Sequence, residues 1–457
     1  MKKYDVIVIG SGCGLNIVNE TLAHGLSVAL VDKGPLGGTC ANLGCIPSKM
    51  LIFPAEGITE IQEAKKLGIE TDIRDIDFKS IMERMRKVVR EDREHMRQEL
   101  SYVAKLDFYE GEGYFVSDYT IEVNGEKIKG DKVFIASGSR PLIPPINGLE
   151  NLDYLTNETV LQLTERPGNL IIVGGGYVAV EYGHFFAAMG TRVTILEMAD
   201  RLVLSEEPEI AETLKNEMSR RMSVHTGVQA EAVKSNEHDA TVVVNDLKNG
   251  GRKEFTAQRI LMAVGRRSNA DLLKVENTGV ELDKRGFIKV DEYLETTKKN
   301  IFAVGDINGQ QMFTHVANVE ASLAADNAVH GNKTRMDYSA APHAVYSHPQ
   351  IASVGMTEEA ARKAHKVLVG KARYSDVAQG EAMMEENGFA KAIVEADTGK
   401  ILGFHIIGPY APILIQEVIN AMASGATVDQ IQASMHIHPA ITELIPRVFS
   451  NLEDTTA

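Results

Sequence analysis

The sequence of 457 residues is poor in cysteine, with only Cys13, Cys40 and Cys45. So few cysteines cannot form the disulfide framework of a secreted protein, and the expected location is the reducing cytoplasm, where a lasting disulfide is catalytic rather than structural. A cysteine-built zinc site usually needs four ligands, often in Cys-x-x-Cys pairs, and the sequence has no second close pair. We therefore predict a cytoplasmic protein without a bound metal ion.

Long apolar runs and basic clusters are also missing. No uninterrupted run of about 18 apolar residues occurs, so no membrane-spanning helix is expected. The apolar run Val6–Ile9 is too short for a signal peptide, and the acidic Asp5 precedes it. The 48 lysines and arginines are outnumbered by 63 aspartates and glutamates, which gives a formal charge of −15. Such a chain repels nucleic acids and anionic membranes, so neither is an expected partner.

The two closely spaced cysteines lie in the segment 37–49, which reads GGTCANLGCIPSK. Its glycines allow a tight turn before Cys40 and a close approach to a flat partner before Cys45. An apolar helical pattern follows from Ile46, so Cys45 is expected near a helix N-terminus, where free amides and the helix dipole favour a thiolate. Lys49 lies one turn later on the same helix face and adds a positive charge. The segment is therefore suited to cycling between a dithiol and a disulfide.

A dinucleotide fingerprint opens the sequence: a strand, a glycine turn, a helix and a second strand that ends in an acid. The strands are expected at 6–9 and 27–31, and the turn between them contains Gly10, Gly12 and Gly14. These glycines admit a pyrophosphate to the helix N-terminus. Asp32, 22 residues after Gly10, is placed to accept a hydrogen bond from a ribose hydroxyl.

Two residues of this first turn need separate interpretation. Leu15 stands where the fingerprint has its third glycine, so the helix and the strand are expected to pack differently there. Cys13 is interpreted as a small loop residue, with a second redox role as the less favoured alternative.

The same pattern recurs in the middle of the chain. Strands are expected at 169–173 and 192–196, with a helix between them that ends near residue 188. The turn contains Gly174, Gly176 and Ala179, and the second strand ends at Glu197. Two fingerprints predict two bound dinucleotides. The Glu197 carboxylate would repel the 2′-phosphate of NADP, so NAD is the predicted nicotinamide, with NADP as the alternative.

The cysteine segment resembles the active-site signature of the flavoprotein disulfide reductases, also called pyridine nucleotide-disulfide oxidoreductases. The motifs along essentially the whole chain follow the order of that family. The resemblance implies FAD at the first fingerprint and NAD at the second, with electrons passing between nicotinamide, flavin and a redox-active disulfide of Cys40 and Cys45. It also implies that Cys45 faces the flavin, that Cys40 exchanges with the substrate, and that Lys49 lies near the flavin's reactive edge.

Further cofactor contacts are implied by the resemblance alone. The implied FAD contacts include Lys33, Gly38, Thr39, Ser137, Gly138, Gly305, Asp306, Thr314 and Ala317. The implied contacts on the nicotinamide side are Tyr177, Gly265 and Arg266. Tyr177 would cover the flavin until the nicotinamide displaces it. Glu181 matches the glutamate that pairs with the equivalent of Lys49. In this family Ala179 favours NADP, but we give the charge of Glu197 more weight.

An acid–base pair is expected near the C-terminus. Thiol–disulfide exchange needs a base, and histidine suits because its pKa lies near neutral pH. His438 precedes Pro439 and is followed by Glu443, which matches the His-Pro…Glu pair of the family. In the family this base serves the cysteines of the other subunit, so the resemblance implies a homodimer with two shared sites. His436 is interpreted as structural.

The predicted fold class is α/β, with two Rossmann-like dinucleotide-binding domains and a C-terminal α+β interface domain for dimerisation. From about residue 338, strands such as 390–394 and 401–407 alternate with helices such as 413–423, and no glycine fingerprint appears. The predicted boundaries are 1–146 for the first part of the FAD domain, 147–268 for the NAD(P) domain, 269–337 for the second part of the FAD domain, and 338–457 for the interface domain.

Within the family, the residues most resemble dihydrolipoamide dehydrogenase, so the expected substrate is a small dithiol or disulfide or a lipoyl-bearing protein. A glutathione reductase would want cations where the first helix offers Asn19 and Glu20. Mercuric reductases usually carry a cysteine pair in the tail, which Ser450–Ala457 lacks, although reduction of a metal ion by the central pair stays open. Lys49 and Met50 look more like mycothione reductase, the runner-up. A non-enzymatic scaffold would not need the intact cysteines and histidine.

Overall fold

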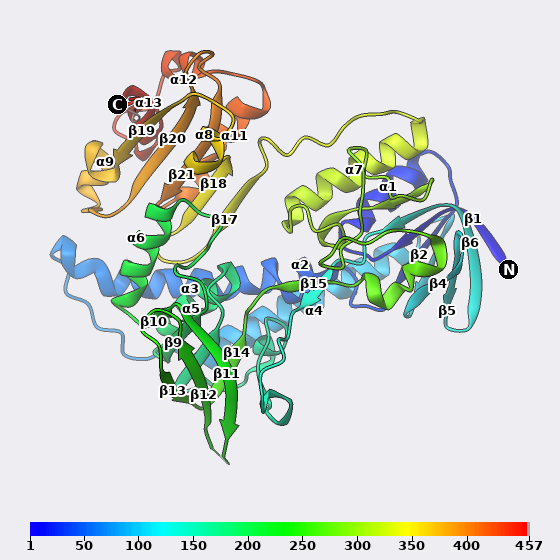
Figure 1. Ribbon diagram of the computed structural model, residues 1–457, viewed down its shortest axis with the longest axis horizontal. Coiled ribbons are helices and arrows are strands. Elements are labelled where there is room, and N and C mark those ends of the chain that lie inside the picture. Colours follow the sequence, from blue (N-terminus) through cyan, green and yellow to red (C-terminus); the bar gives the residue numbers. More distant parts are fainter. Residues whose placement is uncertain (237, 455–457) are drawn as a thin grey trace. The chain divides into compact units, whose positions relative to one another are not determined.

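The computed structural model describes residues 1–236 and 238–454 of the chain (Figure 1). These residues form two compact units, and each unit is described by itself. Unit 1 comprises Met1–Met50, Met82–Ile143 and Gly265–Met336. Unit 2 comprises Leu51–Ile81, Pro144–Val264 and Asp337–Ala457. Each unit is therefore assembled from three separate stretches of the sequence.

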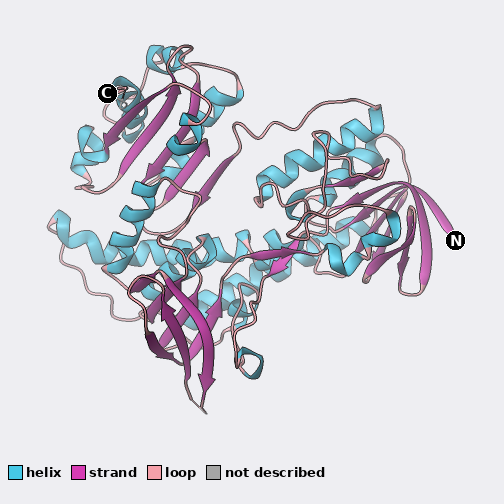
Figure 2. Ribbon diagram, in the orientation of Figure 1, coloured by secondary structure: helices cyan, strands magenta, loops and turns pink. Residues whose placement is uncertain are grey.

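Unit 1 is built on a mixed sheet in the order β3-β2-β1-β6-β5-β4 (Figure 2). The pairings from β3 to β6 are parallel, whereas β5 and β4 add antiparallel. Strand β16 pairs in parallel with the last residues of β6. The strands are β1 (Lys2–Ile9), β2 (Val28–Asp32), β3 (Leu106–Glu110), β4 (Gly113–Ser117), β5 (Thr120–Val123), β6 (Glu126–Ile135) and β16 (Ile301–Ala303).

Strand β1 is continuously apolar from Val6 to Ile9 because both of its faces are covered. Ile7 and Ile9 enter one buried cluster, and Val6 and Val8 enter the other. The second cluster also contains buried residues of the helices α1 (Gly14–Ala23) and α7 (Thr314–His330), which therefore cover that face of the sheet. Both helices start at the carboxyl ends of parallel strands, the edge where such sheets place their ligands.

Three more helices and a short ribbon complete the elements around this edge. They are α2 (Gly38–Leu43), α3 (Cys45–Glu63) and α4 (Phe78–Ser101), of which α3 and α4 run from one unit into the other. The antiparallel ribbon of β7 (Ser139–Pro141) and β15 (Arg266–Ser268) lies where the chain leaves unit 1 and where it returns. These crossing segments were expected from the apolar runs that end at Ala136 and Val264.

Unit 2 contains a second parallel sheet in the order β10-β9-β8-β14. Its strands are β8 (Asn169–Val173), β9 (Arg192–Glu197), β10 (Ser223–Thr226) and β14 (Arg259–Met262), with α5 (Tyr177–Ala188) after β8 and α6 (Pro208–Ser219) after β9. An antiparallel sheet follows, made of β11 (Val228–Ser235), β12 (Ala240–Asp246) and β13 (Arg252–Ala257). The strand–turn–helix–strand arrangement of the second fingerprint is therefore formed as predicted.

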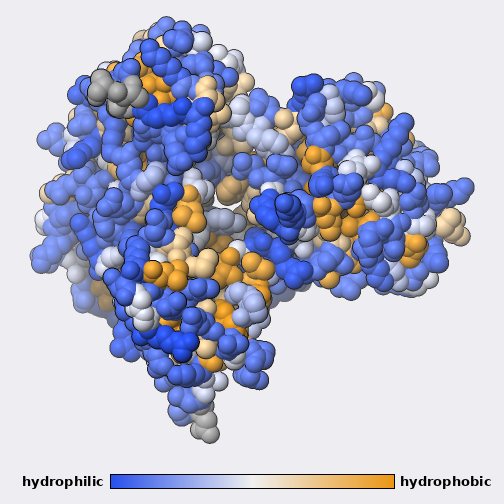
Figure 3. All heavy atoms as spheres, in the orientation of Figure 1, coloured by the Kyte–Doolittle hydropathy of each residue, from blue (hydrophilic) through white to orange (hydrophobic). Residues whose placement is uncertain are grey.

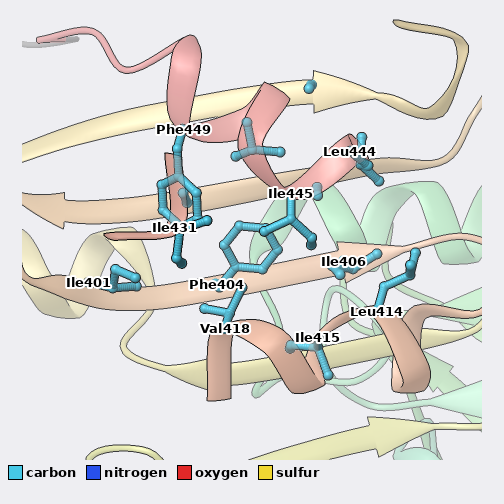
Figure 4. Packing of buried hydrophobic residues seen from close by; sticks show 14 of the residues in the cluster. Ile401, Phe404, Ile406, Leu414, Ile415, Val418, Ile431, Leu444, Ile445 and Phe449 are labelled. Carbon is cyan, nitrogen blue, oxygen red and sulfur yellow. The ribbon is translucent and has the colours of Figure 1, made fainter. Parts of the chain in front are cut away.

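The C-terminal part of unit 2 is an antiparallel sheet in the order β17-β18-β21-β20-β19. Its strands are β17 (Pro342–Val345), β18 (Ile351–Gly355), β19 (Val367–Arg373), β20 (Phe389–Glu395) and β21 (Ile401–Ile407). The helices that pack side chains around Phe404 on one face are α10 (Ala411–Leu414), α11 (Gln416–Ala423), α12 (Val428–Ala433) and α13 (Leu444–Ser450) (Figure 4). On the other face α8 (Glu358–Arg362) covers Leu402, and α9 (Ala378–Ala382) follows β19.

The structure confirms the predicted α/β class, with a mixed sheet in unit 1, and a parallel sheet and an antiparallel C-terminal sheet in unit 2. One helix differs from its prediction. The helix expected over 413–423 is divided into α10 and α11 at Ile415, which keeps helical backbone angles but ends one segment and caps the next. Ile415 and Val418 of this segment both reach the cluster around Phe404.

A buried cluster of charged side chains joins α3 to α5 within unit 2. His348, in the loop between β17 and β18, contacts Glu56 Oε1 through Nδ1 at 3.1 Å and Glu63 Oε1 through Nε2 at 3.0 Å. His184 of α5 lies 3.4 Å from the other Glu56 oxygen, and the Arg221 guanidinium donates to His184 Nδ1 at 3.1 Å. The His348 ring thus lies between two carboxylates at a partly buried position, which makes the cluster sensitive to the loss of any member.

Within the described residues, none of the helices is long and apolar enough to cross a membrane. The face drawn in Figure 3 is mostly hydrophilic, with apolar patches scattered over it.

Candidate active site

The two closely spaced cysteines face each other across a break between two helices in unit 1. Cys40 lies on the short helix α2, and Cys45 is the first residue of α3. Both are free thiols, and their side chains are hydrogen-bonded to each other. Gly44 separates the two helices. The backbone there passes close to the preceding helix, since a Cβ on Gly44 would lie 3.1 Å from the Thr39 carbonyl oxygen. The helical start at Cys45 was predicted, whereas helix α2 was not.

Two helix N-termini meet at this thiol pair. Thr314, the first residue of α7, places its Oγ1 at 3.4 Å from Cys45 Sγ. Lys49 on α3 adds a positive charge that acts on the same sulfur. Unpaired amides and the positive ends of helix dipoles favour an anion at such a position. The contact with Thr314 joins residues 269 positions apart, so no local pattern in the sequence could predict it.

The two sulfurs are electrostatically unequal. The hydrogen bond from Cys40 is the main cause that lowers the pKa of Cys45 to about 6, and Thr314 and Lys49 lower it further against the opposing effect of burial. The pKa of Cys40 is raised, first because its thiol donates to Cys45 and then because it is desolvated. Near neutral pH the reduced pair therefore holds one thiolate, on Cys45, and one thiol, on Cys40.

The two glycine turns have matching geometry. Gly10 has φ +106°, and a Cβ on it would lie 2.3 Å from the Ala136 carbonyl oxygen. Gly174 has φ +117°, and a Cβ on it would lie 2.2 Å from the Ala263 carbonyl oxygen. Both positions therefore require glycine, because any side chain would collide with the adjacent strand end. The repeat found in the sequence is thus also a repeat of backbone structure.

The departure at Leu15 has a structural explanation. Gly14, one residue earlier, makes the close approach between helix and strand, since a Cβ there would lie 2.9 Å from Val8 Cγ1. Leu15 packs at the edge of the cluster formed with α7. The half-buried Cys13 lies against Gly305, and desolvation of its sulfur is the main cause that raises its pKa to about 12. That environment fits the structural reading of Cys13.

The acids at the ends of the fingerprint strands, Asp32 and Glu197, both accept hydrogen bonds from nearby backbone amides. Asp32 accepts hydrogen bonds from the backbone amides of Ser11 at 2.5 Å and Gly34 at 2.7 Å. Glu197 accepts from the amide of Ala199 at 2.6 Å. Each acid is therefore fixed at the mouth of its glycine turn. Lys33, next to Asp32, is exposed and lies 3.4 Å from a Glu112 oxygen.

Residues that the sequence named separately are brought together at the end of β16. The Ser139 hydroxyl donates to Asp306 at 2.5 Å, and Arg266 Nε donates to the same hydroxyl at 2.6 Å. Ser139 was not singled out from the sequence, because only the pairing of β7 with β15 shows its position. Gly305 donates its amide to the buried Glu320 of α7 at 2.6 Å, which holds this loop against the helix.

Several features of unit 1 fit the dinucleotide implied there. A Cβ on Gly38 would lie 2.8 Å from Gly12 Cα, so the active-site segment and the first turn touch through bare backbone. The buried Ser137 hydroxyl has no hydrogen-bond partner within the described chain. Gly138 has φ +67°, and Ala317 lies against Gly305. Bare backbone and an unpaired buried hydroxyl are features of a surface that receives a polar ligand.

In unit 2, the features of the second turn also fit a dinucleotide. Gly176 precedes α5, and a Cβ there would meet nothing within 4 Å among the described residues, so the helix N-terminus is open. Tyr177 is partly exposed, and Ala179 is fully buried. Glu181 is buried and accepts a hydrogen bond from the amide of Tyr346 at 3.0 Å. Gly265, with φ +121°, belongs to unit 1, as do Arg266 and Lys49.

The C-terminal histidine and glutamate form a pair in unit 2. His438 Nδ1 lies 2.9 Å from Glu443 Oε1, and the other Glu443 oxygen accepts from the amide of Ala440 at 3.1 Å. The hydrogen bond to His438 is the main cause that lowers the pKa of Glu443. The carboxylate therefore fixes the ring, and 73% of the His438 side chain is exposed. His436 contacts Glu417 at 2.9 Å through Nε2 and Ser434 through Nδ1, as a structural residue would.

Models of one protein family match residues in both units of the chain. The family model described as pyridine nucleotide-disulphide oxidoreductase matches residues 4–321, and the model of its dimerisation domain matches residues 341–448. The chain is 34% identical over 450 residues to a dihydrolipoyl dehydrogenase of Chlamydia trachomatis, covering 96% of this chain and 95% of that protein. It is 33% identical over 469 residues to mycothione reductase of Mycobacterium tuberculosis, covering 99% and 100%.

Two further matches are a mercuric reductase, found by its sequence, and a flavoprotein disulfide reductase, found by its structure. A mercuric reductase of Lysinibacillus sphaericus is 32% identical over 435 residues, covering 94% of this chain and 79% of that protein. The solved structure of a HOCl-induced flavoprotein disulfide reductase from Escherichia coli, determined as a Cu(II) complex, superposes with a TM-score of 0.87 at 28% identity. That superposition covers 98% of this chain and 99% of the other.

These matches confirm the family, the fold class and the enzymatic nature predicted from the sequence. The family uses FAD and NAD(P)H, and the matched dimerisation domain indicates a homodimer. The chain belongs to the pyridine nucleotide-disulphide oxidoreductases, the flavoprotein disulfide reductases, and is an enzyme of that family.

Proposed function

We propose that this enzyme is an FAD- and NAD-dependent dihydrolipoyl dehydrogenase, which oxidises the dithiol of a lipoyl group, free or carried on a protein. The observation that carries the exchange chemistry is the inequality of its two sulfurs, and the lipoyl substrate is inferred from the 34% identity with the dihydrolipoyl dehydrogenase of Chlamydia trachomatis. Cys45 is held as a thiolate by Cys40, Thr314 and Lys49, whereas Cys40 stays protonated. A pair of this kind separates two tasks, because one sulfur can remain an anion while the other exchanges with the substrate.

The residues that would hold FAD are those of the first glycine turn, Asp32, Ser137 and Asp306, together with the bare backbone at Gly38. Bound FAD would pass an electron pair between the nicotinamide and the sulfurs. Cys45 is the sulfur that would face it, because its negative charge is already stabilised by the surrounding residues. The helix α7, whose first residue contacts Cys45, would direct its N-terminus at the same region.

The exchange steps follow from the two cysteines and the base. The first substrate thiol gives its proton to His438, and the resulting thiolate attacks Cys40 in the Cys40–Cys45 disulfide. That bond breaks and Cys45 leaves as a thiolate, so a mixed disulfide joins the substrate to Cys40. The second substrate sulfur then attacks the substrate sulfur of the mixed disulfide, and its proton passes to the departing Cys40 sulfur. The substrate leaves as a disulfide, and the enzyme holds the electron pair as the Cys45 thiolate and the Cys40 thiol, with the first substrate proton on His438.

His438 is proposed to act on the cysteines of a partner subunit. The ring is oriented by Glu443 yet is exposed, as a base that serves another chain must be. Apolar side chains beside it are also exposed, including Met435 at 101% and Ile437 at 78%. Exposed apolar side chains at such density are typical of an interface that a second copy covers. The pairing of Glu181 with Lys49 stays a proposal.

NAD is the proposed nicotinamide because of Glu197. Its carboxylate is fixed at the end of β9 by the amide of Ala199, where the ribose of the nicotinamide dinucleotide is expected. A 2′-phosphate would meet this fixed negative charge, and the neighbouring Met198 offers no compensating cation.

A substrate panel tests the proposal directly. Purified holoenzyme is assayed with lipoamide, glutathione disulfide, mycothione disulfide and Hg(II), each with NADH and with NADPH. We expect NADH and lipoamide to give the highest kcat/KM, with dihydrolipoamide and NAD reacting in reverse. A preference for another disulfide or for Hg(II) by tenfold or more would contradict the assignment of the substrate.

A mycothione reductase-like enzyme is the alternative. The observation that favours it is the match to mycothione reductase along the full length of both chains. Lys49 and Met50 also resemble that branch. The same panel separates the two functions, since a low-molecular-weight disulfide reductase would reduce mycothione disulfide faster than lipoamide.

A further inference from the structure

A group of metal-binding side chains lies away from the thiol pair, at the C-terminal ends of α1 and α7. Glu20 lies in the last turn region of α1 and His24 caps that helix, four residues apart on one face. His330 is the last residue of α7, four residues after Asp326. Both helices belong to unit 1 and pack side by side against the same buried cluster. The two pairs therefore face each other across the seam between the helices.

The donor atoms are close enough to share one ion. One donor atom from each of Glu20, His24 and His330 lies within 4.8 Å of the other two. The two imidazole rings lie edge to face, with centroids 4.5 Å apart and an interplanar angle of 82°. His330 Nε2 lies 3.7 Å from Asp326 Oδ1, which places a second carboxylate beside the group. Ligands at about 2.0–2.1 Å from one tetrahedral ion lie roughly 3.3–3.4 Å apart, so side-chain rotations must bring these donors closer together by up to roughly 1.5 Å.

The group is preorganised for a cation in two ways. His24 Nδ1 lies 2.9 Å from the Glu20 carbonyl oxygen and 3.6 Å from Glu20 Oε1, so contacts within α1 fix the ring beside that carboxylate. Both histidines stand at helix C-termini, where the unpaired carbonyl groups carry partial negative charge. The side chains are 37% to 41% exposed, so an ion can reach them from solvent.

The donor set selects the class of ion. Two imidazoles and one carboxylate suit Zn²⁺ and its neighbours Co²⁺, Ni²⁺ and Cu²⁺. Mg²⁺ and Ca²⁺ prefer oxygen ligands and are disfavoured by the imidazoles.

We propose that Glu20, His24 and His330 bind one divalent transition-metal ion of the Zn²⁺ class, with Asp326 or water as the fourth ligand. The site is independent of the dithiol and of the proposed reaction, because it uses neither cysteine nor any residue of the two glycine turns. Its ion would tie together the C-terminal ends of two helices whose other ends begin at the first glycine turn and at Thr314. Metal binding at this seam would therefore stabilise the framework that carries the thiol pair.

The test is calorimetric titration of Zn²⁺ into tag-free holoenzyme with the Cys40–Cys45 pair oxidised, so that thiolates do not compete. We expect one Zn²⁺ per chain, with a Kd of about 10 μM or below. His24→Gln and His330→Gln should each weaken binding by about tenfold or more. His95→Gln, which removes an exposed histidine of unit 1 from α4, is the matched control and should bind Zn²⁺ unchanged.

Co²⁺ gives a second readout that does not depend on stability. Its visible absorption should indicate a four-coordinate site with nitrogen and oxygen ligands, and His24→Gln/His330→Gln should abolish it. Circular dichroism and retained flavin check that this variant is folded; if it is not, Glu20→Gln takes its place with the same expectation. The proposal is overturned if the wild-type enzyme binds no Zn²⁺ at 100 times the expected Kd, or if the folded variants bind it as tightly as the wild type does.

Discussion

At the scale of single residues, the account depends on how one sulfur is made acidic. Cys45 stands at the first residue of α3, and its neighbours Cys40, Thr314 and Lys49 each favour the thiolate. Cys40 has the same chemistry, but it donates a hydrogen bond instead of receiving one, and its pKa rises. The different roles of the two cysteines therefore come from their surroundings, not from the side chain itself.

Replacing Thr314 by Val should raise the pKa of Cys45 from about 6 towards its ordinary value, because the thiolate loses a hydroxyl donor. The pH dependence of iodoacetamide alkylation of the two-electron-reduced enzyme measures this pKa. Thr71→Val, an exposed threonine with a local hydrogen bond, serves as control and should leave the profile in place. An unmoved alkylation profile in Thr314→Val would show that α7 does not act on the sulfur.

Glu197 decides the nicotinamide preference at the same scale. We expect kcat/KM with NADH to exceed that with NADPH by tenfold or more, about 1.4 kcal/mol. Glu197→Gln removes the charge that would repel the 2′-phosphate and should narrow this ratio, mainly through a lower KM for NADPH. Glu212→Gln, an exposed acid of α6, is the control. A preference of the wild-type enzyme for NADPH would contradict the claim that the charge of Glu197, and not Ala179, decides the nicotinamide preference.

At the scale of secondary-structure elements, the charged cluster between α3 and α5 has a defined pH dependence. Burial alone would lower the pKa of His348, but hydrogen bonds to Glu56 and Glu63 raise it to about 9. Hydrogen bonds to the histidines lower the pKa of Glu56 to about 2 against the opposing effect of burial. The pKa of His184 falls to about 4, chiefly because that ring is buried. The cluster thus holds one charged imidazole, one neutral imidazole and carboxylates at neutral pH.

The signs of these shifts set the pH window of stabilisation. A raised histidine pKa stabilises the fold fully below the unfolded value near 6.5, and this contribution is lost as the pH rises through about 9. A lowered glutamate pKa stabilises it above about 4.5, and this is lost as the pH falls towards 2. The lowered pKa of His184 acts in the opposite direction to that of His348, because stability is lost as the pH falls from about 6.5 towards 4. The cluster should therefore contribute most near pH 6.5.

Glu56→Gln should lower the free energy of unfolding by about 3 kcal/mol, because it leaves buried positive charge with one carboxylate fewer. It should also reduce the loss of stability between pH 7 and pH 9, since the shift of His348 depends on that carboxylate. Chemical unfolding of the holoenzyme at the two pH values measures both effects. Glu60→Gln, an exposed acid on the same helix, is the control, and an equal effect of the two substitutions would refute the role given to the cluster.

The elements also show which parts of the structure a sequence can reveal. Both fingerprints were located because a strand, a glycine turn and a helix are contiguous, and their local pattern is strong. Helix α2 was missed because it has only six residues, starts with a glycine, and lies between Gly37 and Gly44. Its apolar residues also do not recur at helical spacing. The joining of Ser139 with Asp306 was missed because it depends on strands 167 residues apart. Non-local contacts of this kind leave no signal in a single sequence.

At the scale of the whole molecule, the family, the fold class and the enzyme class followed from motif order and were confirmed by the comparisons. The four-part domain division, the cytoplasmic location and the roles of the individual site residues stay predictions. Under the proposed sharing of each site between two subunits, the substrate would depend on surfaces of both chains, and the short motifs near the cysteines do not encode those surfaces.

The shared site can be tested with hybrid dimers. Cys45→Ser and His438→Gln should each be nearly inactive alone. When the two variants are mixed under conditions that exchange subunits, a hybrid dimer gains one intact site if the base of one chain serves the cysteines of the other. Activity of the mixture, compared with each variant alone, measures this. If subunit exchange is verified and the mixture stays inactive, His438 acts within its own chain.

The most direct measurement of the central claim is the visible spectrum of the holoenzyme after reduction by two electrons. The account predicts a long-wavelength charge-transfer absorption between thiolate and flavin that persists in Cys40→Ser, is lost in Cys45→Ser, and titrates with a pKa near 6 in the wild type. The opposite result, an absorption that survives in Cys45→Ser and disappears in Cys40→Ser, would contradict the assignment of Cys45 as the flavin-facing thiolate.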